Sequence, residues 1–182
     1  CHTIQGLNNV DFNPGTYYIA NGDLYVDHIN GVTCSTCVDG TTGVTFVLTQ
    51  TTGNNSDIGG LFIASDNNVT LSAPPSGTYA GVLAYQDRRA TVGTMASTGK
   101  IFSVTSLNNA KVNGAIYFPN NKIVLSNLNT QINNSTACTV WIGRYINFSN
   151  YNNNYVAGCG TFGTSTAGVT TTTTTTKGKV ME

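Results

Sequence analysis

Charged side chains are scarce in this sequence. Of its 182 residues, 9% are Asp, Glu, Lys or Arg, whereas an ordinary soluble domain has about 25%. Eight basic residues balance eight acidic ones, so the formal net charge is zero. A neutral chain has no field that would attract nucleic acid or an anionic membrane. We therefore expect no nucleic-acid partner.

The sequence is also poor in residues that favour helices. Glu occurs once, as Glu182, while the chain contains 29 Thr, 23 Asn and 20 Gly. β-Branched residues favour strands, and Gly and Asn favour turns, so this composition argues against a helical bundle and against a doubly wound α/β enzyme. It also argues against disorder, because 40% of the residues are apolar. The composition predicts an all-β domain.

Long apolar runs are absent. No stretch reaches the roughly 18 apolar residues of a membrane helix, and no signal peptide is found. An exported protein of this sequence would have lost its leader or anchor, or would carry it outside these residues. Cys1 opens the chain, as a cysteine does in a mature bacterial lipoprotein, but a cut at a domain boundary would give the same start.

The motifs of common catalytic sites are missing too. The sequence has no Gly-x-Ser-x-Gly elbow, phosphate-binding loop or His-Glu-x-x-His motif, so we expect no enzyme, no cofactor and no metal site. The alternative is a polysaccharide lyase or hydrolase; hydrolysis needs two carboxylates close together. Asp66 and Asp87 are 21 residues apart, which matches one coil of a β-helix, and Asp23 and Asp27 form a second pair.

The five cysteines lie at positions 1, 34, 37, 138 and 159. The Cys34–Cys37 motif lies in a segment with loop and strand character, whereas a thioredoxin-type site needs a helix N-terminus. A zinc site would need a second such pair or two His, and Cys138 and Cys159 are 21 residues apart. We therefore prefer two disulfides, Cys34–Cys37 and Cys138–Cys159, with Cys1 left over. Disulfides and low charge indicate an oxidising, extracytoplasmic compartment.

Short strand-like runs alternate with turn-forming residues along the chain, among them Asn30-Gly31, Asp66-Asn67 and Pro119-Asn120. Runs of this kind, rich in Thr and Asn, favour a short right-handed parallel β-helix, a solenoid of about six or seven coils with about 20–25 residues each. A β-sandwich is the alternative, although it would show cleaner alternation and hairpin turns. The expected strands are 16–20, 24–29, 43–49, 61–65, 68–72, 80–85, 100–105, 115–118, 122–126, 139–143 and 145–149.

The end of the chain differs in composition from the rest. Seven consecutive Thr occupy positions 170–176, and such a run has no apolar face but a high β propensity. We expect a β-solenoid domain at residues 1–163 and an extended Thr-rich tail at 164–182. The tail is expected to act as a linker or stalk, or to pair with a neighbouring chain as an edge strand.

The densest polar cluster is Gln86-Asp87-Arg88-Arg89, which directly follows a strand-like run. In one explanation it belongs to a ligand site. The structural explanation, which we favour, is a turn in which Asp87 accepts hydrogen bonds from the backbone or an Arg and holds the following loop, residues 88–100. The candidate ligand-binding residues are Tyr85, Gln86, Asp87 and Arg88.

Tyrosine is a second candidate feature for binding. Its amphipathic ring can stack on a sugar, but it can equally cap the interior of a solenoid or pack a flanking loop. The tyrosines considered for a binding face are Tyr17, Tyr18, Tyr79, Tyr85, Tyr151 and Tyr155.

Four segments give the sequence a family resemblance. They are Asn13-Pro-Gly-Thr-Tyr-Tyr-Ile19, Gly43-Val-Thr-Phe-Val-Leu-Thr49, Ala73-Pro-Pro-Ser-Gly-Thr-Tyr-Ala-Gly-Val-Leu-Ala-Tyr-Gln-Asp87 and Asn113-Gly-Ala-Ile-Tyr-Phe-Pro-Asn120. In this order they resemble the C-terminal domain of TadG-like Flp (Tad) pilus-assembly proteins, from about residue 3 to 163, although the usual aromatic pair before Gln86 is Ala84-Tyr85 here. In that family a single-pass membrane anchor precedes an extracytoplasmic region of this kind.

The resemblance implies a role at the bacterial envelope or cell surface and supplies no catalytic motif. We therefore expect a non-enzymatic structural or adhesive domain. It would present a rigid, neutral face to surfaces, glycans, pilus components or sister subunits.

Overall fold

The computed structural model describes residues 1–38, 41–105, 109–126 and 139–149. Strands make up nearly all regular structure in these residues, so the expected all-β class is confirmed. The one helical element there is the short 3-10 helix η1 (Asn55–Asp57). The strands are β1 (His2–Gln5), β2 (Asn9–Asp11), β3 (Gly15–Ala20), β4 (Gly22–Thr33), β5 (Val44–Thr49), β6 (Ile58–Ser72), β7 (Val82–Gln86), β8 (Phe102–Thr105), β9 (Asn109–Ser126) and β10 (Thr139–Ser149). Among the described residues no helix is long and apolar enough to cross a membrane.

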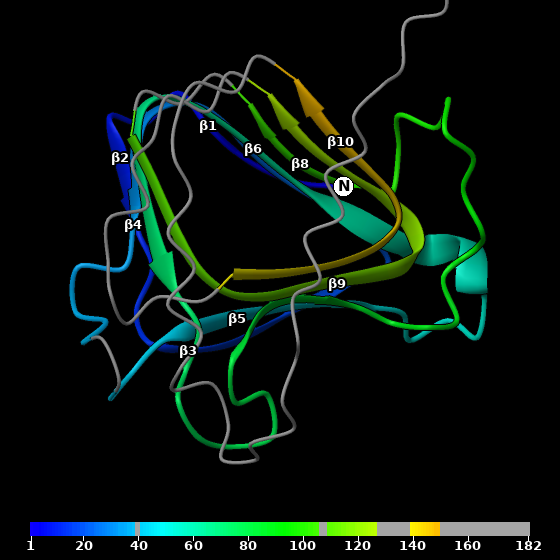
Figure 1. The fold of residues 1–182 in the computed structure, drawn as a ribbon, viewed down its shortest axis with the longest axis horizontal. Coiled ribbons are helices and arrows are strands. Elements are labelled where there is room, and N and C mark those ends of the chain that lie inside the picture. Colours follow the sequence, from blue (N-terminus) through cyan, green and yellow to red (C-terminus); the bar gives the residue numbers. More distant parts are fainter. Residues whose placement is uncertain (39–40, 106–108, 127–138, 150–182) are drawn as a thin grey trace, which may run out of the picture.

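The strands pair in parallel and form one curled sheet with a triangular outline (Figure 1). The first row joins β1 and β8 with parts of β4, β6, β9 and β10. The second row joins β2 with parts of β4, β6 and β9. The third row joins β3, β5 and β7 with parts of β9 and β10. This arrangement is consistent with a solenoid-like fold. The antiparallel pairing that a β-sandwich of hairpins requires does not occur between the described strands, so that alternative is wrong.

Each turn of the chain around the triangle, which we call a level, takes a different number of residues. In the first row, paired residues of successive levels are 22 residues apart between His2 and Leu24, but 37 apart between Leu24 and Leu61. The next steps are 41 residues to Phe102 and 21 residues to Ile123. The long steps contain loops inserted at the corners of the triangle, and the short steps do not. The inserted loops are residues 34–43, 50–57, 73–81 and 87–101.

Several turns expected from the sequence lie inside long strands. Asn30-Gly31, Asp66-Asn67 and Pro119-Asn120 fall within β4, β6 and β9. They bend the chain around a corner while pairing continues on both sides, so residues 61–65 and 68–72 belong to one strand. Strands β1 and β2 were not expected. His2 lies in β1, and its Nε2 is 3.0 Å from the carbonyl oxygen of Ala20.

The interior is a stack of apolar side chains that repeats from level to level. In the first row Leu24 pairs with Leu61, Leu61 with Phe102, and Phe102 with Ile123. All four are buried. Alternate residues of a strand point to opposite faces, so one face of each row fills the interior and the other meets solvent. The outward face is therefore the place to seek a binding site.

Some expected features lie outside the described residues. These are the cysteines Cys138 and Cys159, the tyrosines Tyr151 and Tyr155, the last part of the expected domain, and the Thr-rich segment 164–182.

Candidate binding surface

The outward face of the third row carries tyrosines. In the strand register Tyr18 pairs with Val47, Val47 with Tyr85, and Tyr85 with Tyr117. Their neighbours Tyr17, Phe46, Ala84 and Ile116 alternate with them and pack inward. Alternation along three parallel strands and a segment of a fourth therefore lines up one surface of outward side chains.

A fourth tyrosine, Tyr79, reaches this surface from the loop 73–81. Its ring centroid lies 6.3 Å from that of Tyr18 and 5.9 Å from that of Tyr85. Val47, which lies between those two tyrosines in the register, is only 3% exposed although it faces outward. Tyr79 thus lies at the level of β5, where the outward residue, Val47, is not aromatic. We call Tyr18, Tyr79, Tyr85 and Tyr117 the tyrosine row.

The members of the tyrosine row hold one another in place. The rings of Tyr85 and Tyr117 are parallel, with an interplanar angle of 6° and centroids 5.3 Å apart. The guanidinium of Arg88 lies 5.6 Å from the centroid of the Tyr117 ring, a favourable cation–π distance. Burial raises the pKa of Tyr79, and the neighbouring hydroxyl of Tyr18 and the charge of Asp87 add to this effect. Hence the row is a fixed, uncharged aromatic surface with one cation at its edge.

Asp87 closes a turn at the end of β7. Its carboxylate accepts hydrogen bonds from the backbone N–H of Arg89 at 2.9 Å, from Nη2 of Arg89 at 2.6 Å, and from the hydroxyl of Thr49 at 3.1 Å. The bond from the Arg89 side chain is the main reason why the pKa of Asp87 falls from 3.8 to about 2. These are the bonds that the structural explanation of the polar cluster predicts.

Gln86 lies inside the molecule. Its Nε2 donates to the carbonyl oxygens of Gly59 and Lys100, both at 2.8 Å, and its Oε1 accepts from Nδ2 of Asn121 at 2.9 Å. The residue has no exposed surface. Of the four candidate ligand-binding residues, the structure places Tyr85 and Arg88 on the tyrosine row, Asp87 in the turn, and Gln86 away from the surface.

The acidic residues considered for catalysis lie at separate places in the sheet. Asp87 stacks over Thr49, and its backbone N–H donates to the carbonyl oxygen of Leu48. Asp66 lies in β6, which pairs with β4, β8 and β9, whereas the strand before Asp87 pairs with β5 and β9. Asp23 accepts a 2.5 Å hydrogen bond from the Gly60 backbone.

Asp23 and Asp27 belong to the same strand, β4. Four residues of extended chain separate them by about 13 Å, more than the roughly 5–10 Å that glycoside hydrolysis uses. The spacing of Asp23 and Asp27 therefore does not match a pair of catalytic carboxylates.

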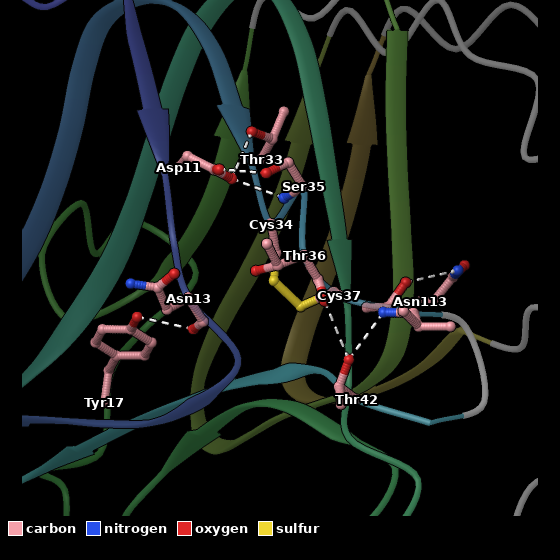
Figure 2. Close-up of a disulfide and its surroundings, with 12 residues drawn as sticks. Asp11, Asn13, Tyr17, Thr33, Cys34, Ser35, Thr36, Cys37, Thr42 and Asn113 are labelled. Atoms are coloured by element: carbon pink, nitrogen blue, oxygen red, sulfur yellow. Dashed lines mark hydrogen bonds between the residues drawn. A yellow bond between two sulfur atoms is a disulfide. The ribbon is translucent and has the colours of Figure 1, made fainter.

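A disulfide joins Cys34 and Cys37 at the corner between the second and third rows (Figure 2). Beside it, the carboxylate of Asp11 accepts hydrogen bonds from the Thr33 hydroxyl at 3.0 Å and the Ser35 N–H at 2.7 Å, and also from the Ser35 hydroxyl. The bonds from Ser35 lower the pKa of Asp11. The disulfide closes the start of the loop 34–43 on itself, and the carboxylate of Asp11 fastens it to the level below.

An open pocket of about 360 Å³ lies at the same corner and extends over the outward face of the third row. Its walls come from three successive levels, and the lining residues are Pro14, Gly15, Thr16 and Tyr18, then Thr42 and Gly43, then Pro74, Ser76, Gly77, Thr78 and Tyr79. Tyr18 and Tyr79 of the tyrosine row form part of the lining, and no acidic or basic residue does. No sequence pattern indicates this pocket, because segments distant in sequence build it.

Tyr117 was also absent from the tyrosines expected to form a binding face. Ile116-Tyr117 pairs with Ala84-Tyr85 in the register, and this shared pattern of an apolar residue before a tyrosine could have identified it. Tyr17, by contrast, was expected on the face but packs inward, with its ring 5.2 Å from that of Phe12 and 5.7 Å from that of Phe46.

Comparisons with known proteins add no relative to this picture. No protein-family model, curated protein or solved structure matches the chain. The function must therefore be inferred from the surface just described.

Proposed function

We propose that the chain is a right-handed parallel β-helix domain with a non-enzymatic, structural and adhesive role outside the cytoplasm. It presents a rigid, neutral face to glycans, to other surfaces or to sister subunits. The tyrosine row is the observation that carries this proposal. Tyrosine is enriched at interfaces, because its ring provides contact area at a small entropic cost and its hydroxyl tolerates water.

Rigidity supports the same role. The rings of the row rest on strands of the sheet and on each other, so little conformational entropy is lost when a ligand binds. The low charge of the chain supports contact with uncharged partners, since no strong field favours an ionic one. The Cys34–Cys37 disulfide supports an oxidising compartment.

The resemblance to TadG-like pilus-assembly proteins is the basis for placing this role at a bacterial envelope or surface. The four resembling segments contain nearly all of β3, together with β5, β7 and the third-row part of β9. They therefore stack on one another as the row that bears the tyrosines. A common architecture of this row would explain why the segments keep their order.

The proposal is tested by incubating the purified chain with a panel of bacterial and host polysaccharides, with and without Ca²⁺. Retention of the protein and shortening of the glycan are followed in the same samples, and self-association is measured by sedimentation velocity. Retention without shortening, or concentration-dependent self-association, is the expected result. Glycan scission that is lost in Asp87→Asn would instead establish an enzyme. A chain that neither binds nor associates would also contradict the proposal.

A further inference from the structure

The open pocket beside the tyrosine row has the chemistry of a sugar site. We propose that it binds one or two units of a neutral polysaccharide, with the Tyr18 ring as the stacking surface. This inference rests on the proposed adhesive function and names the ligand class and the site. A volume of about 360 Å³ falls in the range of small-ligand pockets, about 300–1,000 Å³.

The residues that line the pocket indicate that its ligand is uncharged. Around the pocket are ring surfaces, two prolines, hydroxyls and glycine backbone, with no acidic or basic side chain among them. A charged sugar would lose part of its hydration here without gaining an opposite charge, which is unfavourable. A neutral sugar loses less, because its apolar C–H face and its hydroxyls match ring surfaces and hydroxyls in the wall.

Tyr18 is the more exposed of the two aromatic residues that line the pocket. The residue is 64% exposed, and its ring meets that of Tyr79 at an interplanar angle of 69°. An edge-to-face contact of this kind fixes the orientation of Tyr18 while leaving ring surface uncovered. Tyr85 and Tyr117, in contrast, use ring faces on each other. Within the tyrosine row, Tyr18 is therefore the member best placed to stack on a sugar.

Three hydroxyls near this ring are free to serve a ligand. Thr16, Ser76 and Thr78 are exposed, and no hydrogen bond joins their hydroxyls to another group in the described part of the chain. The hydroxyl of Thr42 differs, since it accepts from the Val38 N–H at 2.8 Å and donates to the carbonyl oxygen of Thr36. Thr42 thus holds the wall, whereas the other three offer donors and acceptors to sugar hydroxyls.

The wall that carries Ser76 and Thr78 is well anchored. The Gly81 N–H donates to the carbonyl oxygen of Pro74 at 2.7 Å, and the Ala80 N–H donates to that of Gly77 at 3.1 Å. Gly77 has a φ of +93°, a conformation that favours glycine, and open space lies where a side chain would project. The loop is therefore preorganised, and no side chain projects from position 77 at the edge of the pocket.

A proline-rich peptide is the competing ligand, because such peptides also bind aromatic grooves. Those grooves lie between aromatic rings, however, and here Tyr79 is turned edge-on against Tyr18 and is only partly exposed. A single stacking surface bordered by hydroxyls favours a sugar instead.

The experiment measures binding of the full chain to dextran, mannan and laminarin, with dextran sulfate as the charged counterpart of dextran and a proline-rich peptide as the competitor. Tyr18→Ala should raise the Kd for the neutral glycan that binds by at least about tenfold. Ser76→Trp, which fills the pocket from an exposed position, should do the same. Tyr18→Phe keeps the ring and should bind within about threefold of the parent chain. Leu7→Ala, which truncates an exposed side chain at the β1–β2 turn, should bind normally. Equal melting temperatures exclude misfolding.

Binding of neutral glycan that is unchanged in Tyr18→Ala and Ser76→Trp would overturn the pocket assignment and leave the proposed adhesive function standing. Retention only by dextran sulfate or by the peptide would overturn the neutral ligand. If no glycan is retained but the chain still self-associates, the sugar site is wrong and the structural role remains. A chain that neither retains glycan nor self-associates would contradict the sugar site and the proposed adhesive function together.

Discussion

The amide of Asn121 donates a 2.9 Å hydrogen bond to the amide oxygen of Gln86, and both residues are buried. Gln86 ends β7 and Asn121 lies within β9, one level further along the sheet. Each amide also bonds to backbone carbonyl oxygens, those of Gly59 and Lys100 for Gln86 and that of Thr91 for Asn121. This pair therefore ties two levels to the loop 87–101.

Replacing Asn121 should destabilise the protein. In Asn121→Ala the Oε1 of Gln86 loses its donor in the interior, and we expect the free energy of unfolding to fall by about 1–3 kcal/mol. Urea unfolding followed by circular dichroism measures this. Asn55→Ala, at an exposed position in η1, serves as control and should change stability by less than about 0.5 kcal/mol. Equal effects of the two substitutions would refute an interior role for the pair.

The Asp87–Arg89 contact should make stability depend on acid. Because folding lowers the pKa of Asp87 from 3.8 to about 2, the contact stabilises the fold above pH 3.8 and is lost as the pH falls through about 2. Arg89 is 56% exposed, so solvent screening limits the gain to about 1 kcal/mol. Urea unfolding of the parent chain and Asp87→Asn should differ by this amount at pH 7 and converge near pH 2. A difference that stays constant down to pH 2 contradicts the assignment.

The sequence predicts strands where apolar residues are dense, as in β5 and β7, and misses those that are mostly polar. In β1 and β2 the inward side chains packed against the core are Ile4 and Val10, which is too short a pattern to recognise. The sequence also shows turns at Asn30-Gly31 but not that pairing continues through them. These failures have one cause, since stacking on the next level supplies hydrogen bonds that no local pattern records.

The candidate site, like the fold, can be predicted from the sequence only in part. The turn at Asp87 depends on residues two positions apart, so local chemistry predicts it. The burial of Gln86 depends on Asn121, 35 residues later, and the pocket depends on three levels of the sheet. Contacts between residues so far apart in sequence can be predicted only from the strand register. The inserted loops make the spacing of the strand-like runs irregular, so the register cannot be deduced from that spacing.

Close packing of the levels predicts a sharp difference between two glycines. A Cβ at Gly59 would collide with the backbone of Gly22 and Asp23, whereas one at Gly99 would meet nothing within 4 Å. Gly59→Ala should therefore cost about 2 kcal/mol or more, because the backbone must shift. Gly99→Ala should stay within about 0.5 kcal/mol of the parent chain. Thermal unfolding of the two variants tests this, and similar melting temperatures would mean that the levels are less tightly packed at Gly59.

The Cys34–Cys37 disulfide should stabilise the corner that carries the pocket. It holds the start of the loop whose end, Thr42 and Gly43, lines the pocket. Closing so short a loop is worth about 2 kcal/mol in the chain-entropy account, so replacing both cysteines with Ser should lower stability by about that amount. Urea unfolding without reductant measures the loss, and Cys1→Ser, which removes an exposed free thiol, should have little effect.

Peptide mapping of the native chain provides the independent check on this bond. Without reductant, an alkylating reagent should modify Cys1 but leave Cys34 and Cys37 unmodified, because their sulfurs are joined. After reduction and unfolding, both should react. Alkylation of Cys34 and Cys37 in the unreduced protein would show that the corner is held without a covalent link. The hydrogen bonds that Asp11 accepts from Thr33 and Ser35 would then have to fasten the loop alone.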